Sequence, residues 1–275
     1  MRTVLLAFTL LASAAAQTIS TGNPDGLMAV GSRPGIAPKI EIEAGDDFIL
    51  EGGLSLSGLR SVVHGTFTGL LTGGATISNI GVVTVQIYRV FPNDSVNPPS
   101  GNVPTRVNSP ADNEFDDRST SKSTLTFSAT LLNPTFTAAN SVLNGINKVP
   151  NQTTGGEGPV TGQEVQFDVT FNPPFDLPAP DLNSPVGTHY FFVPQVQVTG
   201  GEFMWLSAPR PIVSPGISFA PDLQAWIRNA NLDPDWLRIG TDIVGGSKAP
   251  TFNMTFTLDA VFESSDLIFL SFFFN

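Results

Sequence analysis

Acidic and amide side chains dominate the part of this sequence whose residue types and spacing could do chemistry. The densest group is the stretch "ADNEFDDR", with the oxygen-bearing residues Asp112, Asn113, Glu114, Asp116 and Asp117. Calcium takes roughly six to eight hard oxygen ligands, and acidic loops between strands often supply them. The spacing does not match an EF-hand. Two interpretations stay open, a solvated acidic loop and a calcium site, and calcium is the one cofactor that the sequence suggests.

Paired carboxylates are a second chemical feature, because a glycosidase requires only two of them. The candidates stand near the N-terminus and around the turn "TTGGEGPVTGQE": Glu41, Glu43, Asp46, Asp47, Glu157 and Glu164. Nothing in their spacing brings two of them together across a cleft. Glycoside hydrolysis is therefore the third-ranked function.

Nucleophilic, metal and nucleotide chemistry find little support. The sequence contains no G-x-S-x-G elbow, no phosphate loop and no dinucleotide fingerprint. Its two histidines, His64 and His189, both fall in strand-like segments, and without Cys they supply a zinc site poorly. We expect structural roles for both histidines, assign no catalytic residue and predict a protein that is not an enzyme.

Three tryptophans could offer flat platforms for sugar rings: Trp205, Trp226 and Trp236. The alternative is packing, since Trp226 shares a helical face with Leu223 and Ile227, and Trp205 alternates with another aromatic residue. Trp236, in "DPDW", is the one we expect to be partly exposed. Carbohydrate binding, with or without calcium, is the alternative function that these residues suggest.

The elements that must position these residues are strands. Apolar and polar residues alternate with period two in "TLTFSATLL", "EVQFDVTF" and "TFNMTFTLDAVF". Further strands are predicted at 46–50, 61–71, 80–91, 188–198 and 202–208. The segments 80–91 and 188–198 are apolar on both faces, which predicts central strands, although Pro194 favours an edge or a bulge. The pattern predicts an all-β fold, an antiparallel β-sandwich of jelly-roll type.

Helix is expected in only two short insertions between strands. "FTAANSVLNGI", residues 136–146, places apolar residues near helical spacing. Residues 221–234 put Leu223, Trp226 and Ile227 on one face, and Pro234 ends the segment because the residue before a proline leaves the helical region.

A long polar segment, residues 91–110, follows one of the predicted strands. Its prolines restrict the backbone and disfavour pairing as a regular strand. A connection of this length is functional or disordered in most domains. We favour a stiff surface loop that covers a sheet edge, and a ligand-binding rim is the alternative.

The N-terminus has the features of a secretory signal peptide, residues 1–16. Arg2 precedes a short apolar stretch, and Ala14 and Ala16 provide small residues before a cut at Gln17. Removing Arg2 takes the net charge from −11 to −12, and this acidity argues against nucleic acid and anionic membranes as partners. An exported chain of this size with no Cys indicates a bacterial origin.

Several longer stretches carry a resemblance to a known group of proteins. Among them are "VQIYRVFPNDSVNPPSGNVPTRVNSPADNEFDDR", "NQTTGGEGPVTGQEVQFDVTF" and "DLQAWIRNANLDPDWLRIGTDIVGG". From about residue 21 to residue 262 the chain resembles uncharacterised secreted bacterial proteins that often carry a PEP-CTERM-type sorting tail. The resemblance implies export, a cell-surface or exopolysaccharide setting and a β-rich fold, and it assigns no catalytic residue.

The end of the chain departs from that pattern. "VFESSDLIFLSFFFN" has no Pro-Glu-Pro, and its apolar run at 267–274 is too short to cross a membrane. It can be a final core strand, a truncated or frame-shifted sorting tail, or a partner-docking peptide. The expected organisation is a signal peptide (1–16), one β-sandwich domain (17–265) and an apolar end (266–275).

Taken together, these features predict a secreted, non-enzymatic bacterial protein of the cell surface or extracellular matrix. The expected partners are polysaccharide or proteins of the cell surface. Nucleic acid is not expected as a partner, and no membrane span is expected in this chain.

Overall fold

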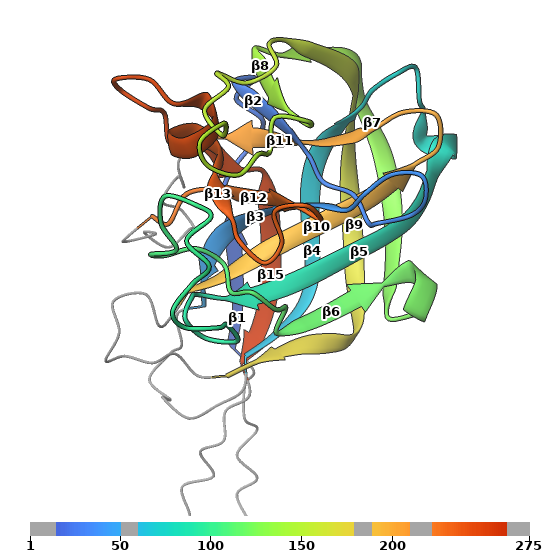
Figure 1. Cartoon of the computed structure of the whole chain (residues 1–275). Coiled ribbons are helices and arrows are strands. Elements are labelled where there is room, and N and C mark those ends of the chain that lie inside the picture. Colours follow the sequence, from blue (N-terminus) through green and yellow to red (C-terminus); the bar gives the residue numbers. More distant parts are fainter. Residues whose placement is uncertain (1–14, 51–59, 179–188, 210–221, 263–275) are drawn as a thin grey trace, which may run out of the picture.

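The strands predicted from alternation assemble into two sheets (Figure 1). The computed structural model describes residues 15–50, 60–178, 189–209 and 222–262. The larger sheet follows the order β1 (Ala15–Ser20), β15 (Phe256–Phe262), β4 (Arg60–Leu71), β11 (Phe203–Ala208), β2 (Met28–Gly31) and β8 (Asn140–Val142). Three strands branch from it: β9 (Val160–Leu177) on β4, β7 (Leu125–Ala138) on β9, and β14 (Asn253–Met254) on β11.

The smaller sheet has six strands. Their order is β13 (Leu237–Arg238), β12 (Trp226–Asn229), β3 (Ile42–Ile49), β10 (His189–Val198), β5 (Ile80–Arg89) and β6 (Asp116–Ser119). All of its pairs are antiparallel, and in the larger sheet only β2 and β8 run parallel. The all-β prediction is confirmed, and the two sheets pack as a sandwich-like pair.

The predicted alternation of apolar and polar residues matches burial in strand β9, because one of its faces packs against the core. In β9, Phe167, Val169 and Phe171 are buried, whereas Asp168 and Thr170 between them are exposed. Burying such side chains is the main favourable term in folding, at roughly 1.5–3 kcal/mol each. The prediction that 188–198 forms a central strand is also confirmed, since β10 lies between β3 and β5.

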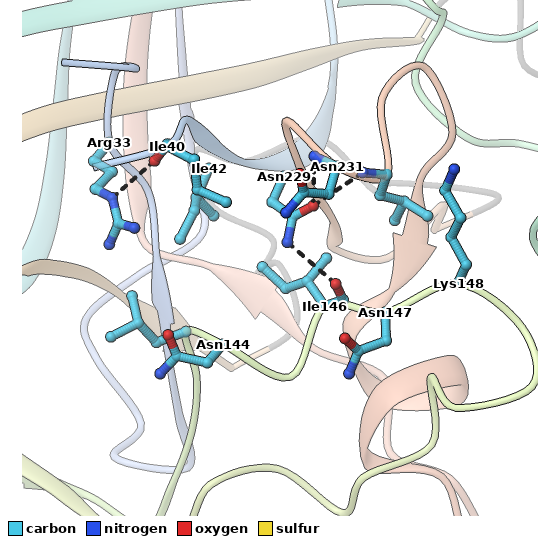
Figure 2. Close-up of a pocket in the computed structure, with 11 residues that line it drawn as sticks. Arg33, Ile40, Ile42, Asn144, Ile146, Asn147, Lys148, Asn229 and Asn231 are labelled. Atoms are coloured by element: carbon cyan, nitrogen blue, oxygen red, sulfur yellow. Dashed lines mark hydrogen bonds between the residues drawn. The ribbon is translucent and has the colours of Figure 1, made fainter. Parts of the chain in front are cut away.

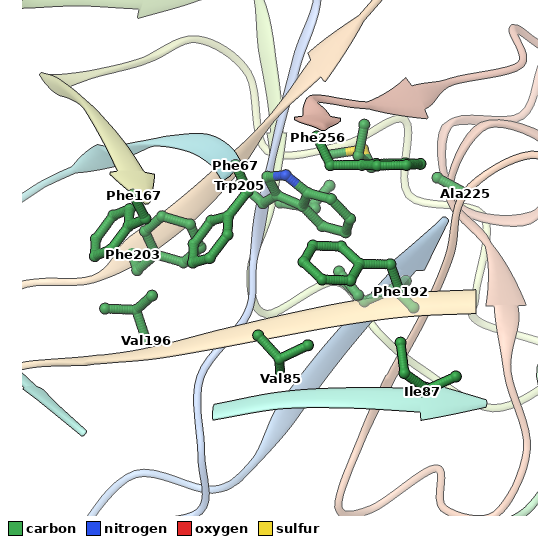
Figure 3. Packing of buried hydrophobic residues seen from close by; sticks show 14 of the residues in the cluster. Phe67, Val85, Ile87, Phe167, Phe192, Val196, Phe203, Trp205, Ala225 and Phe256 are labelled. Carbon is green, nitrogen blue, oxygen red and sulfur yellow. The ribbon is translucent and has the colours of Figure 1, made fainter. Parts of the chain in front are cut away.

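The core between the sheets is rich in aromatic rings (Figure 3). Phe67 of β4 stacks on Phe167 of β9, with ring centroids 4.8 Å apart. Phe192 of β10 reaches across from the smaller sheet to Trp205 and Phe256 of the larger one, at 6.1 and 5.6 Å. These rings join the two sheets into one buried cluster.

Pro194 interrupts the ladder of β10 although this strand is central. Pairing with β3 stops at Phe192, because proline has no N–H to donate. The hydroxyl of Ser32 donates to the carbonyl of Pro194 in that gap. On the other side, the register with β5 shifts between Val196 and Val198. β10 is therefore not an edge strand, and its bulge lies at residues 196–198, beyond Pro194, which still pairs in register with Val85 of β5.

Both predicted helices are wrong. Residues 136–138 continue β7, and 140–142 form β8 alongside β2. In the second segment Gln224 has a φ of 57°, which breaks a right-handed helix. The following residues pair with β3 as strand β12, so Trp226 and Ile227 lie on opposite faces. The described helical turns are short: Ile77–Asn79, Thr120–Lys122 and the π-turn Ile239–Val244.

The proline-rich segment covers the outer face of the smaller sheet instead of its edge. A second apolar cluster lies on that face, and its members include Val90 and Ala111, which directly precede and follow the segment. The other members are Tyr88, Phe191, Val193, Leu223, Trp226 and Trp236. Arg106 of this segment is only 4% exposed and pairs with Asp235 at 3.0 Å. Trp236 donates to the carbonyl oxygen of Ala111 at 2.9 Å. The segment is therefore a covering loop, as predicted, but it covers a face of the smaller sheet and not a sheet edge.

Some predictions concern residues outside the described part of the chain. They include most of the signal peptide (1–14) and the apolar C-terminal end (266–275). Among the described residues, no helix has the length and apolar character that crossing a membrane requires.

Candidate functional site: an asparagine-lined pocket

The three tryptophans predicted as sugar platforms are all buried. Trp205 and Trp236 are 0% exposed and Trp226 is 1% exposed. Each indole N–H has an internal acceptor, the carbonyls of Thr255, Ala111 and Leu223 respectively. The expectation that Trp236 is partly exposed is wrong, because the proline-rich segment lies over it. None of the three rings can stack on a sugar in this structure.

The acidic stretch predicted to bind calcium does not converge on one point. Its carboxylates pair with separate cations: Asp112 with Arg106 at 2.8 Å, Asp116 with Arg118 at 2.7 Å, and Asp117 with Lys122 at 2.5 Å. The amide of Asn113 donates to the carbonyl of Asp94, and Glu114 lies on an exposed rim. Residues 112–114 lie in a loop, whereas residues 116 and 117 belong to strand β6, so their side chains do not share one site. Among the described residues, no three His, Asp or Glu side chains are placed to hold a metal ion.

Carboxylates do gather at an acidic pocket of about 320 Å³ beside β3 and β12. Its lining consists of Glu41, Glu43, Gln86, Asp112, Asn113, Glu114, Arg228, Ala230 and Asp233. Arg228 is the central cation: it binds Glu43, pairs with Asp233 at 2.9 Å and donates to the Tyr88 hydroxyl. Burial, and then the nearby charge of Glu43, raise the pKa of Glu41.

The two histidines bind carboxylates, as structural histidines do. His189 is buried, and its Nδ1 lies 2.7 Å from Asp47. His64 lies on the outer face of the larger sheet between Asp259 and Asp168, at 2.9 and 3.1 Å. Neither pairing has a sequence signal, because the partners are separated by 104 residues or more along the chain and meet only through sheet pairing.

A further pocket, of about 300 Å³, was not predicted (Figure 2). Three chain segments far apart in sequence form its walls: Arg33 with the start of β3, the loop after β8, and the turn after β12. Its lining residues are Arg33, Ile40, Ile42, Leu143, Asn144, Ile146, Asn147, Lys148, Asn229, Asn231 and Leu232. We call it the asparagine pocket. It combines aliphatic side chains with four amides and contains no Asp or Glu.

The buried side chain of Asn229 holds two walls of the asparagine pocket together. The side chain of Asn229 accepts from the backbone N–H groups of Asn231 and Leu232, both at 3.0 Å. It also donates to the carbonyl of Ile146 at 3.1 Å, which ties two walls together (Figure 2). Asn229 is 8% exposed, so its amide serves the frame of the pocket and is not offered to a ligand.

Glu157 fixes the loop that forms another wall. Its carboxylate accepts from the backbone N–H groups of Leu143, Asn144 and Gly145 at 2.8, 2.5 and 2.9 Å. Partial burial raises the pKa of Glu157, but these hydrogen bonds outweigh it, and the net pKa lies below its usual value. Glu157, which the sequence suggested as half of a catalytic pair, is thus a positioning residue for the loop.

The groups left for a ligand are the side chains of Asn147, Lys148 and Asn231. All three are exposed and line the asparagine pocket, and within the described part of the chain none makes a hydrogen bond or an ion pair through its side chain. An amide offers two donors and one acceptor oxygen, and an ammonium offers three donors. Ile40, exposed at 43%, adds an apolar surface beside them.

Comparison with protein-family models, with curated proteins and with solved structures gave no match for this chain.

Proposed function

We propose that this protein acts outside the cell without catalysing a reaction, and that it binds sugar units of an extracellular polysaccharide in the asparagine pocket. The signal peptide, the bacterial cell-surface or matrix setting and the jelly-roll type of the sandwich belong to this proposal as predictions from the sequence. Surface proteins remain the other class of partner. Calcium is not required for binding in this scheme.

The observation that carries the proposal is the free amide chemistry of the pocket. A sugar hydroxyl both donates and accepts a hydrogen bond, and Asn147 and Asn231 offer both kinds of group. Small-molecule sites are concave, with apolar walls and a few well-placed polar groups. A volume of about 300 Å³ with five aliphatic lining residues has this character. With the tryptophans buried, aliphatic side chains such as Ile40 would contact the apolar face of the ring.

Affinity electrophoresis of residues 17–275 through bacterial and plant polysaccharides tests the proposal. We expect retardation by at least one glycan, weakened by Asn147→Ala and by Asn231→Ala. Each substitution removes a hydrogen-bonding side chain worth about 0.5–1.5 kcal/mol, a roughly twofold to twelvefold loss in affinity. Asn23→Ala is the matched control, because Asn23 is exposed and lines neither the asparagine nor the acidic pocket. Retardation that survives both pocket substitutions would contradict the assignment of the site.

Glycoside hydrolysis is a second candidate, favoured by one observation in the acidic pocket. Burial raises the pKa of Glu41, as expected of a general acid, and the exposed carboxylate Glu114 lines the same pocket. If this pair is catalytic, reducing ends should appear on incubation with a bound polysaccharide. Glu41→Gln should then abolish their release and leave retardation in the gel unchanged. No release by the unchanged protein would remove the candidate.

A further inference from the structure

The charged side chains that line the asparagine pocket are all cationic, although the chain as a whole is acidic. The chain has a net charge of −11, yet the asparagine pocket is lined by Arg33 and Lys148 and by no carboxylate. Only the segment 228–233 and the start of β3 separate it from the acidic pocket, where five carboxylates face one guanidinium. The molecule therefore presents two neighbouring pockets of opposite charge.

A second cationic pocket adjoins the first through Arg33. It has a volume of about 210 Å³, and its lining residues are Arg33, Pro34, Ile36, Ala37, Pro38, Lys39, Gln197, Val198, Thr199 and Gly200. Arg33 and Lys39 share the single carboxylate of Glu202, at 2.8 and 2.9 Å. One negative charge thus compensates two cations, so this pocket keeps a positive excess as well.

Lys148 is the cation most available to a ligand. Its side chain is exposed, lines the asparagine pocket and pairs with no carboxylate among the described residues. Lys39, by contrast, also donates to the carbonyls of Val198 and Gly201, which use its donors within the protein. An anionic group in the asparagine pocket would therefore meet the ammonium of Lys148 first, with the hydroxyls of the same sugar unit near Asn147 and Asn231.

We infer that the polysaccharide bound by this protein is acidic, and that it places an anionic group of a sugar unit against Lys148. The inference rests on the proposed function, because it names the class of glycan that the asparagine pocket accepts. The acidic pocket nearby strengthens the selection, since like charges repel a polyanion from that side and leave the cationic pockets as its place to bind. Carboxylate and sulfate groups share this chemistry, and the experiment separates them.

Binding of matched oligosaccharides by calorimetry tests the inference. The ligands are an oligogalacturonate, a neutral galactose oligomer of the same length and a sulfated form of that neutral oligomer. The unchanged protein should bind the galacturonate more tightly than the neutral oligomer. Lys148→Gln should lower affinity for the galacturonate by about twofold to fivefold, the range of an exposed ion pair, and should leave the neutral oligomer unaffected. Lys248→Gln, at an exposed lysine outside both cationic pockets, is the control.

The outcomes separate the inference from the proposed function. Equal or tighter binding of the neutral oligomer, with no effect of Lys148→Gln, would overturn the inference and leave glycan binding standing. No binding of any of the three oligomers, together with no retardation by any polysaccharide in the gel, would remove the proposed function, and the inference with it. If the sulfated oligomer matches the galacturonate and is equally sensitive to Lys148→Gln, the site selects for negative charge. If only the galacturonate shows that sensitivity, the site selects for the carboxylate, and both results support the inference.

Discussion

Asp46 is a buried acid whose environment opposes its charge. It lies in the core with 0% exposure, and one oxygen accepts from the backbone N–H of Met254 at 2.7 Å. Its Oδ1 has no hydrogen-bond partner among the residues that the structure describes. Burial, and then the neighbouring charge of Asp47, raise the pKa of Asp46 well above its usual value. The protonated form is therefore the one that the folded state favours.

Asp46→Asn should stabilise the protein at neutral and alkaline pH. A raised folded-state pKa gives stability that is present below the unfolded-state pKa and is lost as the pH rises through the folded-state value. The amide keeps an acceptor for the N–H of Met254 and cannot ionise. The melting temperature of the variant should exceed that of the unchanged protein at pH 8, by about 2–4 °C per kcal/mol gained, and should approach it near pH 4. A lower melting temperature of the variant at pH 8 would count against this account.

The surroundings of some single residues could not be predicted from the sequence. Trp236 follows Pro234 in a polar turn, which suggested exposure, and its indole in fact donates to Ala111, 125 residues away in the chain. The amides of Asn147 and Asn231 gave no signal at all, because asparagine is a common residue of ordinary turns. Their proximity depends on Asn229 and Glu157, whose hydrogen bonds appear only in the fold.

At the scale of elements, His64 links three neighbouring strands. It lies on β4, with Asp168 of β9 on one ring nitrogen and Asp259 of β15 on the other. Partial burial lowers the pKa of His64, but the hydrogen bonds to Asp259 and Asp168 outweigh it, and the net pKa is raised. The charged ring therefore joins β4 to β9 and β15 on the outer face of the larger sheet.

The stabilisation that protonated His64 gives to the sheet should be lost as the pH rises. Because the folded-state pKa of His64 is raised, its contribution is full below the unfolded value of about 6.5 and disappears as the pH passes the folded value. The group is partly exposed, so we expect no more than about 1 kcal/mol. His64→Gln should reduce the difference in unfolding free energy between pH 5.5 and pH 8.5, measured by urea denaturation. An unchanged difference would show that His64 does not carry this dependence.

The strands were largely predictable, except in the two segments that the sequence pattern predicted to be helices. Period-two alternation located β9 and β15, which bury one face against the core, and β7, whose predicted apolar face is buried only in part. In β7, Leu125 is buried but Leu131 is 43% exposed. The segment around Trp226 and Ile227 looked helical because its apolar residues also fit a 3.6-residue period over a short window. Pairing with β3 decided the outcome, and pairing between residues about 180 apart cannot be seen in a local pattern.

At the scale of the whole molecule, the asparagine pocket proposed to bind sugar lies where connections from three regions of the chain meet. Residues 33–42, 143–148 and 229–232 build the asparagine pocket, and the acidic pocket lies across the segment 228–233. The sequence indicated a sandwich, an acidic chain and a covering loop. It could not indicate the pocket, since loops lie close together only after the strands that carry them have paired.

The most direct test of the central claim is an NMR titration of isotope-labelled residues 17–275 with an oligosaccharide that the protein binds. The account predicts that the side-chain amide signals of Asn147 and Asn231 shift and saturate together, while the signal of Asn23 stays in place. Saturating binding that leaves both pocket amides unmoved, with shifts confined to another face, would contradict the assignment of sugar binding to the asparagine pocket.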